Sequence, residues 1–562
     1  MSVALESPNV APAVMRAARV VLWSVAVCSV VMTAPRGAWG ATVGQDATSN
    51  AAGVKAAGPD ARAAAQGVKS ALPAGPATPG GNAAAALGRA AQAPGSPATA
   101  PQPSGALNEP HAVLFDPFLS DLEERTFRFF WETANPKNGL VPDRYPTPSF
   151  ASIAAIGFGL TAYPIGVERG YVTRAQARER VLVTLRFFAR RAPNEHGFFY
   201  HFVDMKSGQR ANDSEISTVD TSLLLAGVLF CQSYFDRQDR QEIEIRKLAD
   251  EIYRRVDWTW AQPRPPAVAL AWTPEEGFSR YDWNGYNEAM LVYLLALGSP
   301  THPISPTAWT LWTSTYNKHW GTIYDQTYLS FAPLFGHQYT HVWVDFRGIR
   351  DQYMREHGLD YFENSRRATY TQRRYAIANP NHWEGYGKNI WGMSASDGPG
   401  GSEPYLGTEH RFLHYAARGI GVGHITDDGT IAPTAAISSL PFAPEIVLPA
   451  TLEMYHRFGS SIYSSYGFLD AFNPSFHVPA GAESVANVQD AAGVQGAAGP
   501  VNVKADLGWV DPDYIGIDQG PILAMIENYR SDLVWRVMRG DPYIRQGLER
   551  AGFSGGWLSQ PQ

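Results

Sequence analysis

The chain has 562 residues, of which 45% are hydrophobic and 18% are charged, and its formal net charge is −7 at pH 7. An acidic chain without a block of Lys and Arg lacks the basic patch by which proteins bind nucleic acid or anionic lipid, so we expect neither partner. Its two cysteines are Cys28 and Cys231. Because Cys28 precedes the aromatic-rich part of the chain, that part has no cysteine pair and must depend on core packing rather than on disulfide bonds.

Residues 1–40 have the order of features that is typical of a signal peptide. Arg16 and Arg19 precede an apolar run over residues 20–33, and residues 38–40 (Ala-Trp-Gly) form a small-x-small cleavage pattern. The apolar run, about fourteen residues, is shorter than the roughly 20 that span a bilayer, so we expect no stable membrane span in the mature chain. The sequence therefore predicts a periplasmic or secreted protein.

The segment after the signal peptide is poor in large apolar residues. Residues 41–110 consist mainly of Ala, Gly, Pro, Ser and Gln, which bury too little apolar surface to offset their ordering entropy, so we expect a disordered linker. A lipid anchor at Cys28 is not expected, because Val27 is bulky where a small residue precedes a lipidated cysteine. Residues 111–562 carry nearly all the aromatic residues and are predicted to form one domain.

Hydrophobic periodicity in this domain is helical almost throughout, and apolar helices alternate with amphipathic ones. The predicted helices are residues 116–133, 149–167, 173–191, 214–235, 240–258, 284–297, 306–318, 344–378 with a break, 408–417, 434–440, 444–458, 516–528 and 531–548. The best hairpin is residues 196–203, and residues 478–503, rich in Ala, Gly and Val, are expected to be a flexible surface insertion. This alternation predicts an all-α fold, an (α/α)6 toroid with two concentric rings of helices. An α-solenoid is the alternative, but the chain has no fixed repeat period.

The segment 280–289 is the most informative part of the domain. Carboxylates and aromatic rings are crowded there just before the apolar run 290–297, namely Tyr281, Asp282, Trp283, Tyr286 and Glu288. Acids that move protons and rings that stack on pyranose faces are what a sugar-cleaving pocket needs. The alternative is that Glu288 is a first-turn residue favoured by the helix dipole and that the rings are ordinary core.

A second acidic stretch opens the apolar helix predicted over residues 214–235. Asn212 and Glu215 match a capping box, which would explain both without catalysis. Asp220 is not explained in this way, because an acid so near the apolar run is costly unless it is hydrogen-bonded or functional. Glu215 and Asp220 can line one pocket only if Glu215 lies at the mouth of the helix.

Several other residues are weaker candidates. His337 and His341 are spaced as a metal pair, but without an HExxH motif we favour a polar wall for sugar binding over a zinc site. Asp397 lies in a Gly-rich loop and is either a turn residue or a substrate contact, whereas residues 427–429 (Asp-Asp-Gly) are interpreted as a turn. The remaining candidates are Asp470 and Asp518, each an acid among apolar residues, and Trp383 and Trp391, for stacking on sugar.

Several motifs in the sequence resemble those of a known family. The motifs that carry the resemblance are residues 286–290, 297–303, 335–341, 361–368, 427–433, 439–445 and 516–522. They are similar to the glucoamylase-like domain of glycoside hydrolase family 144. The resemblance implies an (α/α)6 barrel that acts on β-1,2-glucan, usually as an inverting endo-hydrolase, with some exo-acting members that release sophorose. It also implies that Glu288 is the catalytic acid, that Glu215 and Asp220 belong to a second acidic stretch, and that Asp470 or Asp518 is the base.

The sequence therefore predicts a secreted β-1,2-glucanase that needs no cofactor or metal and whose partner is a β-glucan. Two alternatives remain at this stage: a retaining transglycosylase that remodels glucans, and a non-catalytic glucan-binding protein of the cell envelope.

Overall fold

The computed structural model describes residues 109–477, 503–504 and 507–560. The predicted signal peptide, the linker up to residue 108 and all but the last residue of the predicted insertion 478–503 lie outside this part of the chain. Among the described residues, no helix combines the length and the apolar character that crossing a membrane requires.

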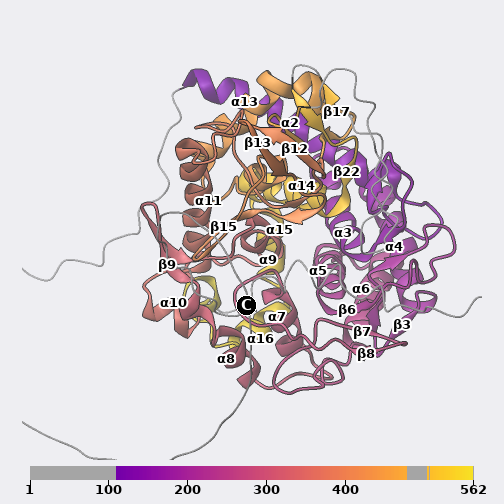
Figure 1. Cartoon of the computed structure of the whole chain (residues 1–562). Helices are drawn as coiled ribbons and strands as arrows, with labels where there is room; N and C mark the ends of the chain where they lie inside the picture. Colours follow the sequence, from indigo (N-terminus) through magenta and orange to yellow (C-terminus); the bar gives the residue numbers. More distant parts are fainter. Residues whose placement is uncertain (1–108, 478–502, 505–506, 561–562) are drawn as a thin grey trace, which may run out of the picture. The chain divides into compact units, whose positions relative to one another are not determined.

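Two sets of helices alternate along the chain (Figure 1). The first set is α3 (Ile153–Glu168), α5 (Thr218–Tyr234), α7 (Met290–Gly298), α9 (Tyr339–Trp343), α12 (Pro433–Ile437) and α14 (Gly516–Ser531). The second set is α2 (Glu109–Thr133), α4 (Arg174–Arg190), α6 (Arg240–Arg254), α8 (Thr307–Thr313), α11 (Tyr361–Ala378) and α13 (Pro444–Ile462). Three more helices, α10 (Gln352–Glu356), α15 (Leu533–Met538) and α16 (Pro542–Arg550), lie between or after these.

The first set forms the inner ring. α3 packs against α5, and α5 packs against α7. α14 packs against α9, against α12 and against the first inner helix, α3. The remaining neighbours are joined by hydrogen bonds: Thr340 Oγ1 donates to the Glu288 carbonyl at 3.3 Å, and Gln338 Nε2 donates to the Ala435 carbonyl at 2.8 Å. Because the last inner helix contacts the first, the ring is closed. The described part of the chain therefore has the predicted (α/α)6 architecture.

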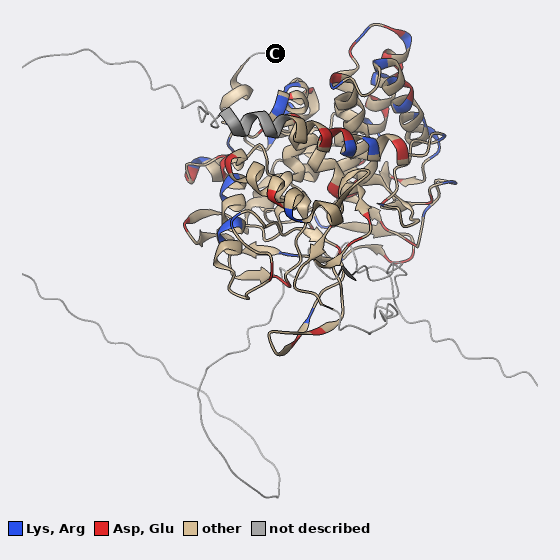
Figure 2. Cartoon of the chain, turned by 90° about the horizontal axis from the view of Figure 1, so that it is seen from above, with Lys and Arg blue, Asp and Glu red and all other residues tan. Residues whose placement is uncertain are grey.

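Inner helices are apolar because protein surrounds them on all sides. Every residue of α3 from Ile153 to Gly166 is buried, and its backbone meets that of α5 at Gly157 and Gly227. A Cβ at Gly227 would lie 2.1 Å from the Gly157 carbonyl oxygen, so only glycine permits this approach. The outer helices α4 and α6 instead carry ion pairs of the exposed kind, such as Arg186 with Glu244. Figure 2 shows where the acidic and basic residues lie along the ribbon of the domain.

The strands are short, pair in an antiparallel manner and lie in the segments that connect the helices. The pairs are β1 (Arg144–Tyr145) with β22 (Tyr514–Ile515), β2 (Ala151–Ser152) with β5 (Phe202–Val203), β3 (Asn194–Glu195) with β4 (Phe198–Phe199), β9 (Trp320–Ile323) with β10 (Gln326–Leu329), β11 (Ala395–Ser396) with β14 (Ala416–Ala417), β12 (Ser402–Tyr405) with β13 (Thr408–Arg411), β15 (Gly419–Gly421) with β16 (His424–Thr426), and β17 (Tyr463–Ser464) with β18 (Gly467–Phe468). Two sheets have three strands: β6 (Ile216–Ser217), β7 (Ala271–Thr273) and β8 (Gly277–Phe278), and β19 (Phe472–Asn473), β21 (Gly508–Val510) and β20 (Val503–Lys504).

Some element predictions were wrong. Residues 408–417 form β13 and β14 rather than a helix, because Leu406 and Gly407, with φ of 48° and 82°, close a two-residue hairpin turn. The helix predicted over residues 531–548 is two helices, since Asp541 caps α16 and Pro542 begins it. The five-residue inner helix α9 was not predicted, because it is too short to show a period. The hairpin predicted at 196–203 lies at residues 194–199.

Candidate active site

Acidic residues meet where the inner helices begin. Asp220 and Asp518 are the third residues of α5 and α14, and Glu288 stands two residues before α7. All three side chains are buried. A carboxylate at a helix N-terminus is favoured by the helix dipole, which reduces the cost of burying it.

Asp397, Asp470 and Asp518 form the centre of this group. The Asp397 main-chain N–H donates a 2.9 Å hydrogen bond to Asp470 Oδ2, and the side chains of Asp470 and Asp518 hydrogen-bond to each other. Burial and the charge of Asp397 raise the pKa of Asp470 to about 7, although the Asp397 N–H and the Asp518 hydrogen bond lower it. Burial and the charge of Asp470 raise the pKa of Asp518 well above its usual range. One of the two carboxyls is therefore the natural proton holder at neutral pH.

Positive charge at this site comes from Arg144 of β1. Its Nη1 lies 2.6 Å from Asp397 Oδ2 and 3.6 Å from Asp513 Oδ2. Carboxylate oxygens of Asp397, Asp470 and Asp511 lie within 4.8 Å of one another, a spacing that a cation with oxygen ligands at about 2.4 Å could bridge. Because Arg144 already supplies a cation beside Asp397, this cluster is compensated by the protein itself, and the absence of a metal site stays a prediction.

The second acidic stretch surrounds a histidine. His201 Nδ1 lies 3.0 Å from Glu215 Oε1, and its Nε2 lies 3.5 Å from Asp220 Oδ1. Burial alone would lower the pKa of His201, but the charges of Asp220 and Glu215 raise it to about 9. The capping-box interpretation of Asn212 and Glu215 was wrong: α5 begins at Thr218, and its N-cap is Ser217, whose hydroxyl accepts from the Asp220 N–H. Glu215 and Asp220 thus both face His201 at the start of α5. Glu215 lies at the mouth of the helix, which is the position it needs if both acids are to line one pocket.

Glu288 joins the group through Tyr339, at the start of α9. The pKa of Tyr339 is raised well above its ordinary value, first by burial and then by charges that include those of Asp518, Glu288 and Asp470. Burial, followed by the charges of Asp518, Asp470 and Asp397, likewise raises the pKa of Tyr415. Acids from four separate parts of the sequence therefore act on the pKa of two phenols.

The other predicted residues of segment 280–289 lie beside this group or outside it. The Trp283 indole N–H donates to Thr218 Oγ1 at 2.9 Å, at the first residue of α5. Tyr286 is buried and stacks on Tyr361, with ring centroids 5.6 Å apart. Asp282 pairs with Arg264 at 2.6 Å, and Tyr281 is 38% exposed. Of these aromatic rings, that of Tyr281 is the one open to solvent.

The two histidines and two tryptophans that were predicted to bind sugar are buried among protein atoms. His337 Nε2 faces the main chain of Phe331, and burial lowers the pKa of His337 to about 3. His341 Nε2 lies 3.1 Å from Ser365 Oγ. Trp391 lies in the core, and the Trp383 indole N–H donates to Asp427 Oδ2 at 2.7 Å. These contacts account for the four side chains by packing, and a role in sugar binding stays a prediction for each.

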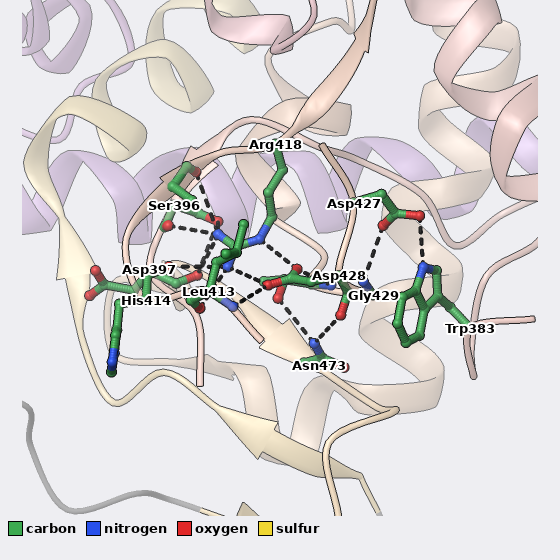
Figure 3. A network of polar contacts seen from close by, with 12 residues as sticks. Trp383, Ser396, Asp397, Leu413, His414, Arg418, Asp427, Asp428, Gly429 and Asn473 are labelled. Atoms are coloured by element: carbon green, nitrogen blue, oxygen red, sulfur yellow. Dashed lines mark hydrogen bonds and ion pairs between the residues drawn. The ribbon is translucent and has the colours of Figure 1, made fainter. Parts of the chain in front are cut away.

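Sequence reasoning missed several members of the site. They are Asp143, Arg144, His201, Tyr339, Tyr415, Asp511 and Asp513. A positional signal could have found Asp511 and Asp513, because they lie shortly before the apolar helix α14, as Glu288 lies shortly before α7. Asp143, Arg144, His201 and Tyr415 carried no such signal. The Asp-Asp-Gly segment 427–429 is a turn, as predicted, but its acids also hold a buried polar network (Figure 3).

Known proteins resemble this chain in sequence and in fold. The family model "Glycoamylase: Putative glucoamylase" matches residues 280–542. A curated relative, the exo β-1,2-glucooligosaccharide sophorohydrolase (non-reducing end) of Parabacteroides distasonis, is 28% identical over an alignment of 467 residues, and the match covers 77% of this chain. The chain spans 58% of the length of that relative.

Two solved structures cover the domain more completely. A protein of Bacteroides uniformis that is described as a putative glucoamylase superposes with a TM-score of 0.67 at 30% sequence identity. The match covers 79% of this chain and 99% of the Bacteroides uniformis chain. The endo-β-1,2-glucanase of Chitinophaga pinensis, solved with sophorotriose and glucose, has a TM-score of 0.66 at 28% identity, with coverage of 79% and 99%. Together with the family model, these matches show that the chain belongs to the glucoamylase-like family of glycoside hydrolases, of the family 144 type.

Proposed function

We propose that the protein is a glycoside hydrolase that cleaves β-1,2-glucan by an inverting acid/base mechanism. The observation that carries the proposal is that three buried acids, Glu288, Asp470 and Asp518, all contribute to the negative charge that raises the pKa of Tyr339. Support comes from the relatives of Parabacteroides distasonis and Chitinophaga pinensis, whose names state action on β-1,2-linked glucose. Inverting hydrolysis requires one carboxyl that donates a proton and one carboxylate that receives one, on opposite faces of the sugar.

Glu288 is the proposed acid. Its proton goes to the glycosidic oxygen as the bond from that oxygen to C1 breaks, either directly or through a hydroxyl of the substrate. Asp470 is the proposed base: it takes a proton from the water whose oxygen attacks C1. Of the two candidates for this role, Asp470 is favoured because it accepts the Asp397 N–H, a hydrogen bond that favours its ionised form. Burial and the charge of Asp470 raise the pKa of Asp518 well above its usual range.

The remaining charged groups have a binding role in this proposal. With its pKa near 9, His201 is a cation at neutral pH between Glu215 and Asp220. Such a fixed array offers donors and acceptors to the hydroxyl groups of a glucose unit. Export through the N-terminal signal peptide belongs to the same proposal, and mass spectrometry of the mature N-terminus in a native host tests it.

To test the proposal, the purified protein is incubated separately with linear β-1,2-, β-1,3- and β-1,4-glucans, and the products are followed by NMR. We expect turnover of β-1,2-glucan with an initial α-anomer, since inversion changes the configuration at C1. An initial β-anomer with chain lengthening would identify the retaining transglycosylase instead. Binding of glucan without turnover would contradict the enzymatic function.

The matched variants are Glu288→Gln and, on an exposed loop, Glu276→Gln. Loss of the acid should reduce kcat by about 10²-fold or more while glucan affinity is retained. The Glu276 variant should keep wild-type kcat. Equal activity of the two variants would remove Glu288 from the mechanism.

A further inference from the structure

Arg418, just after β14, is a fully buried cation. It is 1% exposed and forms a bidentate ion pair with Asp428, with Nε 2.6 Å from Oδ1 and Nη2 2.9 Å from Oδ2 (Figure 3). Burial raises the pKa of Asp428, but the charge and hydrogen bonds of Arg418 more than offset this and the pKa is lowered. A buried pair of this kind contributes little net stability, so its contacts rather than its charge indicate what it does.

The remaining N–H groups of Arg418 bridge the two ends of a chain excursion. Nη1 donates to the Ser396 carbonyl at 3.0 Å, and Nη2 donates to the carbonyls of Leu413 and His414 at 2.9 and 3.1 Å (Figure 3). The hairpin β12–β13 lies between these two anchor points. One guanidinium therefore fixes both ends of the excursion at the place where it leaves and rejoins the domain.

Two residues of the acidic site stand at these ends. Asp397 follows Ser396 directly, and Tyr415 follows His414. With the Ser396 carbonyl held by Arg418, the peptide between Ser396 and Asp397 has a set orientation, and its N–H donates to Asp470 Oδ2 at 2.9 Å. A hydrogen bond to a carboxylate favours the ionised form. Arg418 thus acts on Asp470 through one peptide group.

Asp428 ties the same network to the segment that carries Asp470. It accepts the Leu413 N–H at 2.8 Å, and its carbonyl accepts Asn473 Nδ2 at 2.9 Å, three residues after Asp470. The space around the guanidinium is full: a Cβ at Gly398 would lie 2.1 Å from Arg418 Nη2. Such a filled site allows one position of the guanidinium and hence one orientation of the peptide.

We propose that Arg418, held by Asp428, is a positioning residue that presents the Asp397 N–H to the Asp470 carboxylate. This inference deepens the proposed function, because Asp470 is the proposed base there. Arg418 touches neither substrate nor reacting atoms in this account. A merely structural role would lower stability alone, whereas a positioning role also changes the proton affinity of Asp470.

The primary variant is Arg418→Lys, which keeps the charge and loses the fork of donors. Without the oriented N–H, the ionised form of Asp470 loses about one charge-assisted hydrogen bond, so the acid limb of the kcat–pH profile should move up by about one pH unit. Independently of activity, hydrogen exchange followed by mass spectrometry should show at least about tenfold faster exchange in the peptide that contains the Asp397 amide.

Arg174→Lys is the matched control. Arg174 forms a bidentate pair with the fully buried Glu242, at 2.8 and 2.9 Å, between the outer helices α4 and α6. It should lose stability like Arg418→Lys but leave the acid limb and the exchange of the Asp397 peptide unchanged. Gly398→Ala is the second variant, because its methyl group displaces the guanidinium while both charges remain; it should reproduce both effects if Arg418→Lys fails to fold.

The outcomes separate the two proposals. Faster exchange at Asp397 together with a shifted acid limb supports the positioning role. Unchanged exchange, or a shift that Arg174→Lys shows equally, overturns it. A wild-type protein that turns over no glucan overturns the proposed function, and the exchange measurement then decides the positioning role alone.

Discussion

Arg144 Nη1 lies 2.6 Å from Asp397 Oδ2, and this ion pair joins residues 253 positions apart in the sequence. The same side chain lies 3.7 Å from Asp143 and 3.6 Å from Asp513. Burial raises the pKa of Asp143, and the charge of Arg144 opposes this rise. A single guanidinium thus faces three carboxylates that come from distant parts of the sequence.

Arg144→Gln should therefore weaken the fold in a pH-dependent manner. Arg144 lowers the pKa of Asp470, so its removal should move the acid limb of activity to higher pH. At pH 7 the free energy of unfolding should fall by about 1–3 kcal/mol, because the acids lose their partner at a site that is partly exposed. Near pH 4 the loss should shrink as the carboxyls take up protons. Urea unfolding at both pH values measures this.

The control is Arg374→Gln. Arg374 pairs with Asp325 at 3.0 Å, and both side chains are about half exposed, so this variant should cost less than about 1 kcal/mol at either pH. A loss in Arg144→Gln that is equal at pH 4 and pH 7 would show that packing, not charge, is its contribution.

Asp470 and Asp518 should respond differently to amide substitution. Asp470→Asn cannot take a proton from water, so kcat should fall by about 10²-fold or more. Asp518→Asn should stay within about tenfold of the wild type, because the Asn amide can donate to Asp470 as the protonated carboxyl does. Initial rates on β-1,2-glucan across pH 5–9 compare the two. If Asp518→Asn loses as much as Asp470→Asn, the two roles must be exchanged or shared.

The ring could be predicted from the sequence because the burial of its helices is a local property. α3 is buried from Ile153 to Gly166 and most of α5 is buried as well, so their apolar character shows in any window of the sequence. Strand β13 was mistaken for the start of a helix because its pairing with β12 depends on two turn residues, Leu406 and Gly407, that lie before the predicted helix. The short helix α9 owes its place to its neighbours in the ring rather than to its own sequence.

The clearest signal for the site is an acid that stands beside an apolar run. Glu288, Asp220 and Asp518 have this signature, and all three lie in the acidic group. Arg144, His201 and Arg418 have roles that depend on partners far away in sequence, such as Asp397 for Arg144. No spacing rule connects such pairs, because the ring closure that brings them together is set by the core and not by the residues themselves.

His201 should make stability depend on pH in the alkaline range. Its pKa in the folded state is about 9, above the ordinary 6.5, so the folded protein binds a proton that the unfolded chain releases. The stability that this provides is complete below pH 6.5 and is lost as the pH rises through 9, with a slope of at most about 1.4 kcal/mol per pH unit. In His201→Gln this slope should be absent, as urea unfolding between pH 5 and 10 can determine.

The matched variant is His456→Gln, on an exposed part of α13. It should keep the wild-type slope over the whole range. If His201→Gln and His456→Gln have the same pH dependence, the charge of His201 is not held by Asp220 and Glu215.

Gly227→Ala should destabilise the inner ring. Alanine favours a helix over glycine by about 1 kcal/mol, but here its Cβ would lie 2.1 Å from the Gly157 carbonyl oxygen on α3. Two buried helix backbones must separate to admit the methyl group, and overpacking of this kind costs about 3 kcal/mol or more, so the clash outweighs the propensity. Urea unfolding should show a lower midpoint, and activity should fall as well because α5 carries Asp220. Gly387→Ala, at a position where a Cβ meets nothing within 4 Å, should leave both unchanged; a Gly227 variant as stable as this control would mean that α3 and α5 are not in backbone contact.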